Sequence, residues 1–386
     1  MITFSFSGQT YQTGRIIGNL EGSSSGPALM FFGAVHGNEP SGVVALQEVF
    51  AELESNKVPL AGKLMGVAGN LSALAENRRY IAKDLNRIWT RNQLQNSDSC
   101  REALGNEYNE QQELHHLIQP LLEGNRPAYF LDLHTTSSDS APFIAINDQL
   151  ENRRFAMKIP VPTVLGIEEF LEGPLLSYLN EFGPVALAFE AGQHDNPESA
   201  KTHKSFIYRA MVASGIMQES DIPQADQGKH QAHLENLGRT NRGFYEVVHK
   251  RTITNDDNFS MNPGYQNLTS IKKGEILAKD RNGQIQAPVG GRIFMPLYQS
   301  SGNDGFFVVR KIPAWAIVLS RLLRNLNFDT ALTLLPGVSR HTDHPESLVI
   351  NKKVARFLAK QIFHLLGYRR KKDNGDVMIF SRREIN

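Results

Sequence analysis

Three residues with metal-binding side chains follow two apolar segments of the chain. His36 and Glu39 come directly after the apolar run 27–35, and His134 ends the run that starts at 127. Apolar runs of this length predict strands covered on both faces, and such strands end at the ligand-binding edge of an open α/β sheet. Neutral imidazole and carboxylate are ligands that zinc accepts, and a catalytic zinc keeps one position open for water. We therefore predict one zinc ion per chain, held by His36, Glu39 and His134.

Charged residues in two further segments could act on a substrate beside such an ion. Glu190 closes another apolar strand, and a carboxylate at a strand end near a zinc-bound water is a candidate general base. The segment 77–89 contains Arg79 and Arg87, whose planar guanidinium groups suit a carboxylate. This combination indicates an acidic substrate or a charged transition state. The alternatives are a surface helix with ordinary arginines and a structural role for His36.

Composition and charge exclude several other classes of function. The 386 residues contain 41 Lys and Arg against 40 Asp and Glu, so the formal net charge of +1 provides no basic field for nucleic acid. Cys100 is the single cysteine, which excludes an intramolecular disulfide and leaves His and carboxylate groups to hold a metal. The sequence contains neither a P-loop nor a G-x-G-x-x-G motif, so no nucleotide cofactor is indicated.

The N-terminal segment and the apolar runs bear on where the protein works. Residues 1–15 lack a basic region followed by an apolar one, so we expect no signal peptide. No run reaches the ~18 apolar residues that a membrane span needs. We therefore expect a cytoplasmic protein with neither a membrane nor a nucleic-acid partner.

The composition and hydrophobic pattern of the sequence change three times along the chain. Strands alternate with helical patterns over 1–218, which predicts an α/β domain with a largely parallel or mixed sheet. The polar segment 219–240 is interpreted as a linker. Short β-like runs separated by glycines predict a small β-rich, barrel-like domain over 241–314. An amphipathic pattern at 352–366 predicts that 315–386 is an α-rich C-terminal extension.

Four motifs together resemble the succinylglutamate desuccinylase and aspartoacylase family. They are H-G-N-E at 36–39, R-Y-I-x-x-D-L-N-R at 79–87, D-L-H-T at 132–135 and the strand-end Glu190. The motifs occur in the family's order, and the resemblance extends over roughly 25–315. That family is similar in fold and site to zinc carboxypeptidases. The resemblance therefore implies a three-layer α/β/α domain with a mixed sheet, followed by a smaller β-rich domain.

The resemblance also implies roles for the reacting groups. The zinc ligands of the family match His36, Glu39 and His134. Its catalytic glutamate matches Glu190, which would activate a zinc-bound water and then return the proton to the leaving amine. Its carbonyl-polarising arginine matches Arg79, which would stabilise the oxyanion.

Three more positions follow from the same motifs. Asn86 and Arg87 match the pair that binds the carboxylate of the substrate, and Asp84 matches an aspartate that orients the first zinc histidine. The implied function is a zinc-dependent hydrolase of the amide bond in a small N-acyl amino acid, as in succinylglutamate desuccinylase or aspartoacylase. Such enzymes act on carbon–nitrogen bonds of linear amides other than peptide bonds. The alternatives are a carboxypeptidase-type hydrolase of a peptide or other amide, and a non-catalytic metal-binding protein. A homo-oligomer is left open.

The sequence also departs from the family pattern. Aspartoacylases carry a further arginine about ten residues before the catalytic glutamate, whereas 177–181 contains none. The stretch 135–139 looks closer to aspartoacylases than to typical desuccinylases. An aromatic donor to the site could come from the β-rich segment, where Tyr245, Tyr265 and Tyr298 are candidates and a structural role is the alternative.

Overall fold

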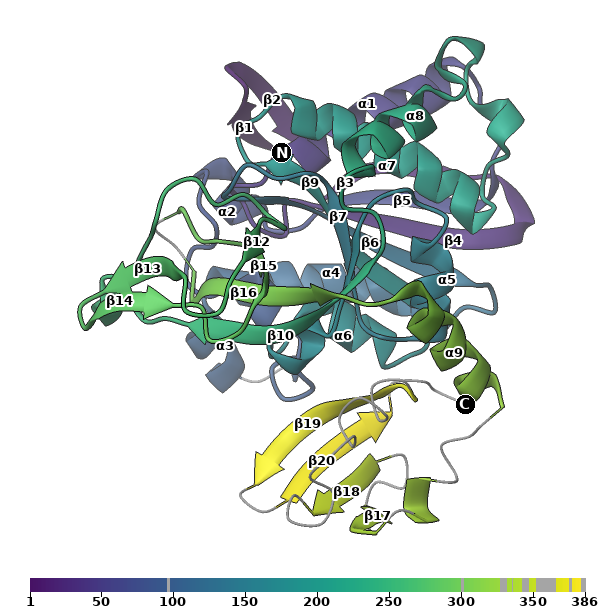
Figure 1. Cartoon of the computed structure of the whole chain (residues 1–386). Coiled ribbons are helices and arrows are strands. Elements are labelled where there is room, and N and C mark those ends of the chain that lie inside the picture. The colour runs from purple at the N-terminus through teal and green to yellow at the C-terminus, as the bar shows by residue number, and fades with distance from the viewer. Residues whose placement is uncertain are drawn as a thin grey trace.

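The structure is built around one large mixed sheet (Figure 1). The computed structural model describes residues 1–95, 98–299, 302–326, 332–334, 336–341, 347–351, 366–374 and 377–382. Within these residues the sheet has eleven strands. In order across the sheet they are β12 (Ser270–Ile271), β15 (Gly291–Phe294), β16 (Asp304–Lys311), β10 (Phe244–Thr252), β8 (Thr163–Leu165), β7 (Phe143–Ile146), β9 (Val185–Gln193), β6 (Ala128–Thr136), β4 (Ser23–Gly33), β5 (Ala61–Ala68) and β3 (Ile16–Glu21).

Parallel pairing dominates the centre of this sheet. Strands β5, β4, β6 and β9 run parallel to one another, and β8 is parallel to both β7 and β10. The strands β3, β16, β15 and β12 pair antiparallel toward the two edges, and β7 is antiparallel to β9. The predicted α/β fold with a mixed sheet is therefore confirmed.

Helices cover both faces of the sheet, as Figure 1 shows. The longer ones over the α/β part are α1 (Ser41–Ser55) and α7 (Glu198–Ser214) on one face and α4 (Asn106–Leu122) on the other. The other α-helices of the described residues are α2 (Leu71–Ala75), α3 (Asp98–Leu104), α5 (Leu150–Ala156), α6 (Leu175–Asn180), α8 (Lys229–Gly238) and α9 (Ala314–Asn325). The 3-10 turns include η1 (Leu85–Arg87), η2 (Ile167–Glu169), η3 (Glu219–Asp221), η4 (Gln224–Asp226) and η5 (Asn255–Asp257).

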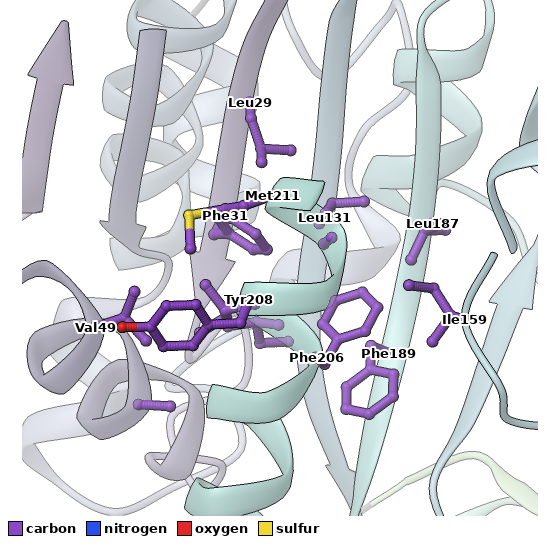
Figure 2. Packing of buried hydrophobic residues seen from close by; sticks show 14 of the residues in the cluster. Leu29, Phe31, Val49, Leu131, Ile159, Leu187, Phe189, Phe206, Tyr208 and Met211 are labelled. Atoms are coloured by element: carbon purple, nitrogen blue, oxygen red, sulfur yellow. The ribbon is translucent and has the colours of Figure 1, made fainter. Parts of the chain in front are cut away.

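Alternate residues of the central strands pack against opposite helix layers, because successive side chains of a strand point to opposite faces. On one face Phe31, Leu131 and Phe189 pack with Val49 of α1 and Phe206 of α7 (Figure 2). The other face of the same strands, including Met30 and Phe130, packs against α4 and α6. Burial on both faces explains why these strands are continuous apolar runs in the sequence.

In the part of the chain that the structure describes, three smaller sheets lie outside the large one. A hairpin joins β1 (Ile2–Phe6) to β2 (Gln9–Thr13). In the β-rich segment the order is β11 (Ser260–Met261), β13 (Ile276–Asp280) and β14 (Gly283–Gln286). Near the C-terminus the order is β17 (Val338–Arg340), β18 (Ser347–Asn351), β20 (Val377–Arg382) and β19 (Tyr368–Asn374).

The proposed domain boundaries remain predictions, and the structure adds detail around them. The segment 219–240 contains η3, η4 and α8, and α8 packs on α7. Strands β10, β15 and β16 of the β-rich segment extend the large sheet. The helix expected at 352–366 lies outside the described residues except for Leu366, and the described part of 315–386 contains α9 and β17 to β20. Among the described helices none combines the length and apolar character needed to span a membrane.

The contact between α7 and α8 involves a histidine held neutral. The ring of His230 on α8 stacks on Tyr208 of α7 with centroids 4.4 Å apart, and His230 Nδ1 lies 3.2 Å from the hydroxyl oxygen of Ser205. Burial lowers the pKa of His230 to about 4 from 6.5, although Asp226 opposes the shift. Protonation of His230 therefore works against this helix contact.

This pKa predicts how stability depends on pH. Between about pH 6.5 and about pH 4 the unfolded chain binds this proton more readily than the folded chain, so stability should fall as the pH falls. His230→Gln removes the titration, and its free energy of unfolding in urea should fall less steeply than that of the wild type from about pH 7 to about pH 5. The control is His116→Gln on the exposed side of α4. Identical slopes for wild type and His230→Gln would contradict the prediction.

Candidate metal centre and active site

The ends of three parallel strands bring distant segments of the chain together. Gly33 at the end of β4 lies opposite Leu133 of β6, and His134 lies opposite Glu190 of β9. The chain leaves β4 through the H-G-N-E motif and enters α1. A Cβ atom at Gly37 would lie 2.1 Å from the carbonyl carbon of Ala73, so only glycine allows this close approach to α2.

His36, Glu39 and His134 form a compact buried cluster. Their possible ligand atoms all lie within 4.8 Å of one another. Nδ1 of His36 lies 3.0 Å from Glu39 Oε1, and Nδ1 of His134 lies 2.9 Å from Glu39 Oε2. The backbone N–H of Thr135 donates to Glu39 Oε2 at 2.9 Å. Burial opposes ionisation of Glu39, but the charges of the two histidines outweigh it and hold the pKa of this carboxyl well below its usual range.

Two aspartates contact the opposite nitrogens of the histidine rings. Nε2 of His36 lies 3.0 Å from Asp84 Oδ1, and Nε2 of His134 lies 2.7 Å from Asp132 Oδ2. Such carboxylates fix the tautomer and the orientation of a metal-binding histidine. Both Nδ1 atoms are thereby turned toward Glu39, so two imidazole nitrogens and one carboxylate converge. This set of donors fits zinc.

Asp132 was not singled out in the sequence, although a signal was present. It precedes His134 by two residues in β6, and residues two apart in a strand share a face. Burial opposes protonation of His134, but Asp132 and Glu39 outweigh it and hold its pKa well above the usual range.

Arg79 lies beside the cluster and is held there by Asp84. Nη2 and Nε of Arg79 donate to Asp84 Oδ2 at 3.1 and 3.3 Å, and Nη2 is 2.9 Å from His36 Nε2. Nη1 of Arg79 is 3.7 Å from Glu39 Oε1. Burial opposes ionisation of Asp84, but Arg79 and His36 outweigh it and hold the pKa of this carboxyl well below its usual range. Asp84 thus joins the arginine and the first histidine.

Glu190 is a buried carboxyl group whose Oε2 has no hydrogen-bond partner within the described ranges. Burial raises its pKa to about 8, the negative charges of Glu39 and Asp132 add to this shift, and His134 and Arg79 oppose it. A carboxyl with such a pKa can accept and release a proton near neutral pH, as a general acid–base catalyst must.

Asn86 and Arg87 lie in the turn η1, and both line the cleft beside the metal-ligand cluster. Asn86 Oδ1 accepts a hydrogen bond from the backbone N–H of Leu175 at 2.9 Å, and its Nδ2 lies 3.5 Å from His134 Nε2. Arg87 Nη1 donates to the backbone carbonyl of Asn86 at 2.7 Å, and Nη2 contacts Asp304 at 3.4 Å. Asn86 therefore anchors the start of α6 as well as facing the cluster.

All the site residues expected from the sequence line one cleft of about 990 Å³: His36, Glu39, Arg79, Asp84, Asn86, Arg87, His134 and Glu190. The β-rich segment supplies another wall, which includes Lys250, Gln299 and Asp304.

The three candidate tyrosines of the β-rich segment do not belong to this lining. Their hydroxyl groups donate instead to Asn241 O, Glu275 Oε1 and Asn262 O. A structural role, the alternative considered for them, is what these contacts support.

Comparison with known proteins agrees with this geometry. Residues 25–211 match the family model described as the succinylglutamate desuccinylase/aspartoacylase catalytic domain. This match covers just under half of the chain and indicates the catalytic domain of the succinylglutamate desuccinylase/aspartoacylase family, a family of hydrolytic deacylases.

Curated relatives share limited identity with the chain. A succinylglutamate desuccinylase from Photorhabdus laumondii is 29% identical over 126 residues, which are 31% of this chain and 36% of that protein. A succinylglutamate desuccinylase from Pseudomonas paraeruginosa is 23% identical over 286 residues, covering 70% of this chain and 80% of the relative. A probable aspartoacylase from Acaryochloris marina is 25% identical over 276 residues, with the same two coverages of 70% and 80%.

Solved structures confirm the fold. A succinylglutamate desuccinylase/aspartoacylase from Rhodobacter sphaeroides has a TM-score of 0.57 at 16% identity and covers 76% of this chain and 88% of its own. Murine aminoacylase 3 has a TM-score of 0.51 at 18% identity, with coverages of 74% and 95%. At these identities the likeness concerns architecture, and it confirms the expected zinc-carboxypeptidase-like fold.

Glu107 lies outside the cleft lining but supports a loop of the site, a role that the sequence did not indicate. This glutamate is buried in the first turn of α4. Oε1 accepts hydrogen bonds from the N–H of Ile81 at 2.7 Å and from Asn70 Nδ2 at 3.0 Å, and Oε2 accepts from the N–H groups of Ala82 and Lys83 at 3.0 and 3.2 Å. These backbone groups lie in the segment that joins Arg79 to Asp84, so one carboxylate fixes the loop. Nothing in the neighbouring sequence indicates from which groups Glu107 accepts hydrogen bonds.

Glu107→Gln should loosen this loop. A Gln amide presents N–H groups to backbone donors, and an unsatisfied buried donor costs ~1–3 kcal/mol. We expect hydrogen–deuterium exchange at residues 81–83 to accelerate by about tenfold or more, because about 1.4 kcal/mol corresponds to a factor of ten. The matched control is Glu110→Gln on the same helix, whose carboxylate bonds Arg15 and Ser72 instead. Equal hydrogen–deuterium exchange rates at residues 81–83 in wild type and Glu107→Gln would contradict the proposal that Glu107 fixes this loop.

Proposed function

We propose that the protein is a zinc-dependent hydrolase that cleaves the amide bond of an N-acyl amino acid, as a desuccinylase or a related deacylase. The observation that carries this proposal is the buried His36–Glu39–His134 cluster in one cleft with the unpartnered carboxyl oxygen of Glu190. The match of residues 25–211 to the catalytic domain of a deacylase family supports it. The relatives act, by their names, on succinylglutamate or as aspartoacylases, which suggests the first substrates to try.

The metal would be held by Nδ1 of His36, Nδ1 of His134 and the carboxylate of Glu39, one ion per chain. When bound there, zinc would polarise the acyl carbonyl and increase the acidity of water. Asp84 and Asp132 keep the two rings in the orientation that presents Nδ1.

Glu190 would carry the proton through the reaction. Its carboxylate takes a proton from the attacking water while the water oxygen bonds to the acyl carbon. The proton then goes to the amide nitrogen as the carbon–nitrogen bond breaks, which yields a carboxylic acid and a free amine. Burial raises the pKa of Glu190, which makes its carboxylate a stronger base for the first transfer.

Two groups on the 79–87 segment would hold the substrate. The Arg79 guanidinium, fixed by Asp84 beside the cluster, would stabilise negative charge that develops on the carbonyl oxygen. Arg87, with the Asn86 amide beside it, would bind a carboxylate of the amino-acid half.

Metal content and hydrolysis test this proposal together. We expect about one zinc per chain and activity on a panel of N-acetyl and N-succinyl amino acids. Glu190→Gln should keep its zinc and lose roughly 10²–10⁴-fold in kcat, the usual contribution of a general acid–base group. Glu198→Gln, an exposed glutamate at the start of α7, is the control.

Three results would contradict the proposal. If the protein binds no zinc and hydrolyses none of the N-acyl amino acids in the panel, the proposed hydrolase function is refuted. Activity on peptides alone favours the carboxypeptidase-type alternative. Zinc binding without any hydrolysis favours the non-catalytic alternative. The buried Glu190 is evidence against that alternative.

The aspartates behind the histidines give a separate prediction. Asp132→Asn leaves His134 without its anionic partner at Nε2, so zinc affinity should fall by about 10–100-fold. Competition with a chromophoric chelator measures this loss. Asp139→Asn, on the loop that follows β6, should leave the affinity unchanged, and equal affinities for wild type and Asp132→Asn would be the contrary result.

A further inference from the structure

Where the turn η1 meets the β-rich segment in the wall of the cleft, two cations share one carboxylate. Lys250 Nζ lies 2.5 Å from Asp304 Oδ1, and Arg87 Nη2 lies 3.4 Å from Asp304 Oδ2. Each carboxylate oxygen therefore faces one cation. All three residues line the same cleft as the metal-ligand cluster.

This group is built into the fold. Asp304 begins β16 opposite Thr252 of β10, and Lys250 lies on β10 two residues earlier. Lys250 Nζ also donates to the backbone carbonyl of Phe170 at 2.9 Å. The side chains of Arg87, Lys250 and Asp304 are 30%, 16% and 19% exposed, so both cations are held in fixed positions and remain reachable from the cleft.

The charges of this wall do not cancel. Arg87 and Lys250 contribute two positive charges and Asp304 one negative charge, which leaves one positive charge. Apart from the metal-ligand cluster and Glu190, the other charged groups of the lining add up to zero charge. Arg79 forms an ion pair with Asp84, and the positive charge of Lys83 is offset in the sum by the negative charge of Glu172. One incoming carboxylate therefore neutralises the wall, and a second would meet Asp304.

Resting on the proposed function, we propose that Arg87 and Lys250 together bind a single carboxylate of the amino-acid half. Asp304 bridges the two cations and repels a second carboxylate. The preferred substrate is then the N-acyl derivative of a monocarboxylic amino acid, and derivatives of aspartate and glutamate are disfavoured. Lys250 and Asp304 act as specificity-determining residues contributed by the β-rich segment.

Glutamine and glutamate form an isosteric pair that isolates this charge effect. With the acetyl group in common, the wild type should hydrolyse N-acetylglutamine with a kcat/KM about tenfold above that for N-acetylglutamate, the size of one partly screened charge repulsion. Asp304→Asn should shift this ratio toward glutamate by about tenfold. Asp280→Asn is the matched control, because it breaks the Arg251–Asp280 ion pair in the same segment outside the cleft.

Lys250→Met tests the second cation. It should raise KM for N-acetylglutamine by about tenfold, the loss of one charge-assisted hydrogen bond, with little change in kcat. A purely structural role would lower the folded fraction, and hence the apparent kcat, without raising KM. Lys279→Met, an exposed lysine on β13, should change neither constant.

The outcomes separate this inference from the function on which it rests. If the wild type hydrolyses no N-acyl amino acid, the proposed function itself is refuted. If it hydrolyses N-acetylglutamate as well as N-acetylglutamine, or if Asp304→Asn leaves the ratio unchanged, only the subsite is refuted. A Lys250→Met effect on N-succinylglutamine that is absent for N-acetylglutamine would place the subsite at the acyl half and overturn the assignment.

Discussion

A buried carboxylate between two imidazole rings is the constraint on which the site depends. Glu39 contacts Nδ1 of both His36 and His134, so each ring must turn its Nε2 outward. Those outward nitrogens meet Asp84 and Asp132. The orientation of Arg79 follows in turn, because Asp84 also accepts its hydrogen bonds. One buried charge thus organises both the metal ligands and the group beside them.

The parts of the structure that could be predicted from sequence are the apolar strands and the polar residues that directly follow them. Continuous apolar runs revealed the parallel strands, because strands buried on both faces need apolar residues at every position. Polar residues directly after such runs had to lie at one edge of the sheet, which located His36, His134 and Glu190 together. The motif containing Arg79 and Asp84 became informative through its resemblance to a family, whereas its spacing alone left a surface helix open.

What escaped prediction depends on contacts between distant parts of the chain. Arg87 and Asp304 are 217 residues apart, and no periodicity relates a turn in the α/β part to the first residue of a later strand. Glu107 resembles any glutamate in the first turn of a helix, yet it accepts hydrogen bonds from a loop about 25 residues earlier. Asp132 is an exception, because the two-residue period of β6 places it on the same face as His134.

The pairing of β8 with β10 has a consequence for shortened forms of the protein. Phe244 to Glu246 lie in parallel register with Thr163 to Leu165, so the β-rich segment covers what would otherwise be an open edge of the sheet. A chain cut after residue 240 would retain the metal-ligand cluster but expose unpaired N–H and C=O groups along β8. Such an edge invites strand addition by other chains and aggregation. The segment that carries Lys250 and Asp304 therefore also closes the β8 edge against pairing with other chains.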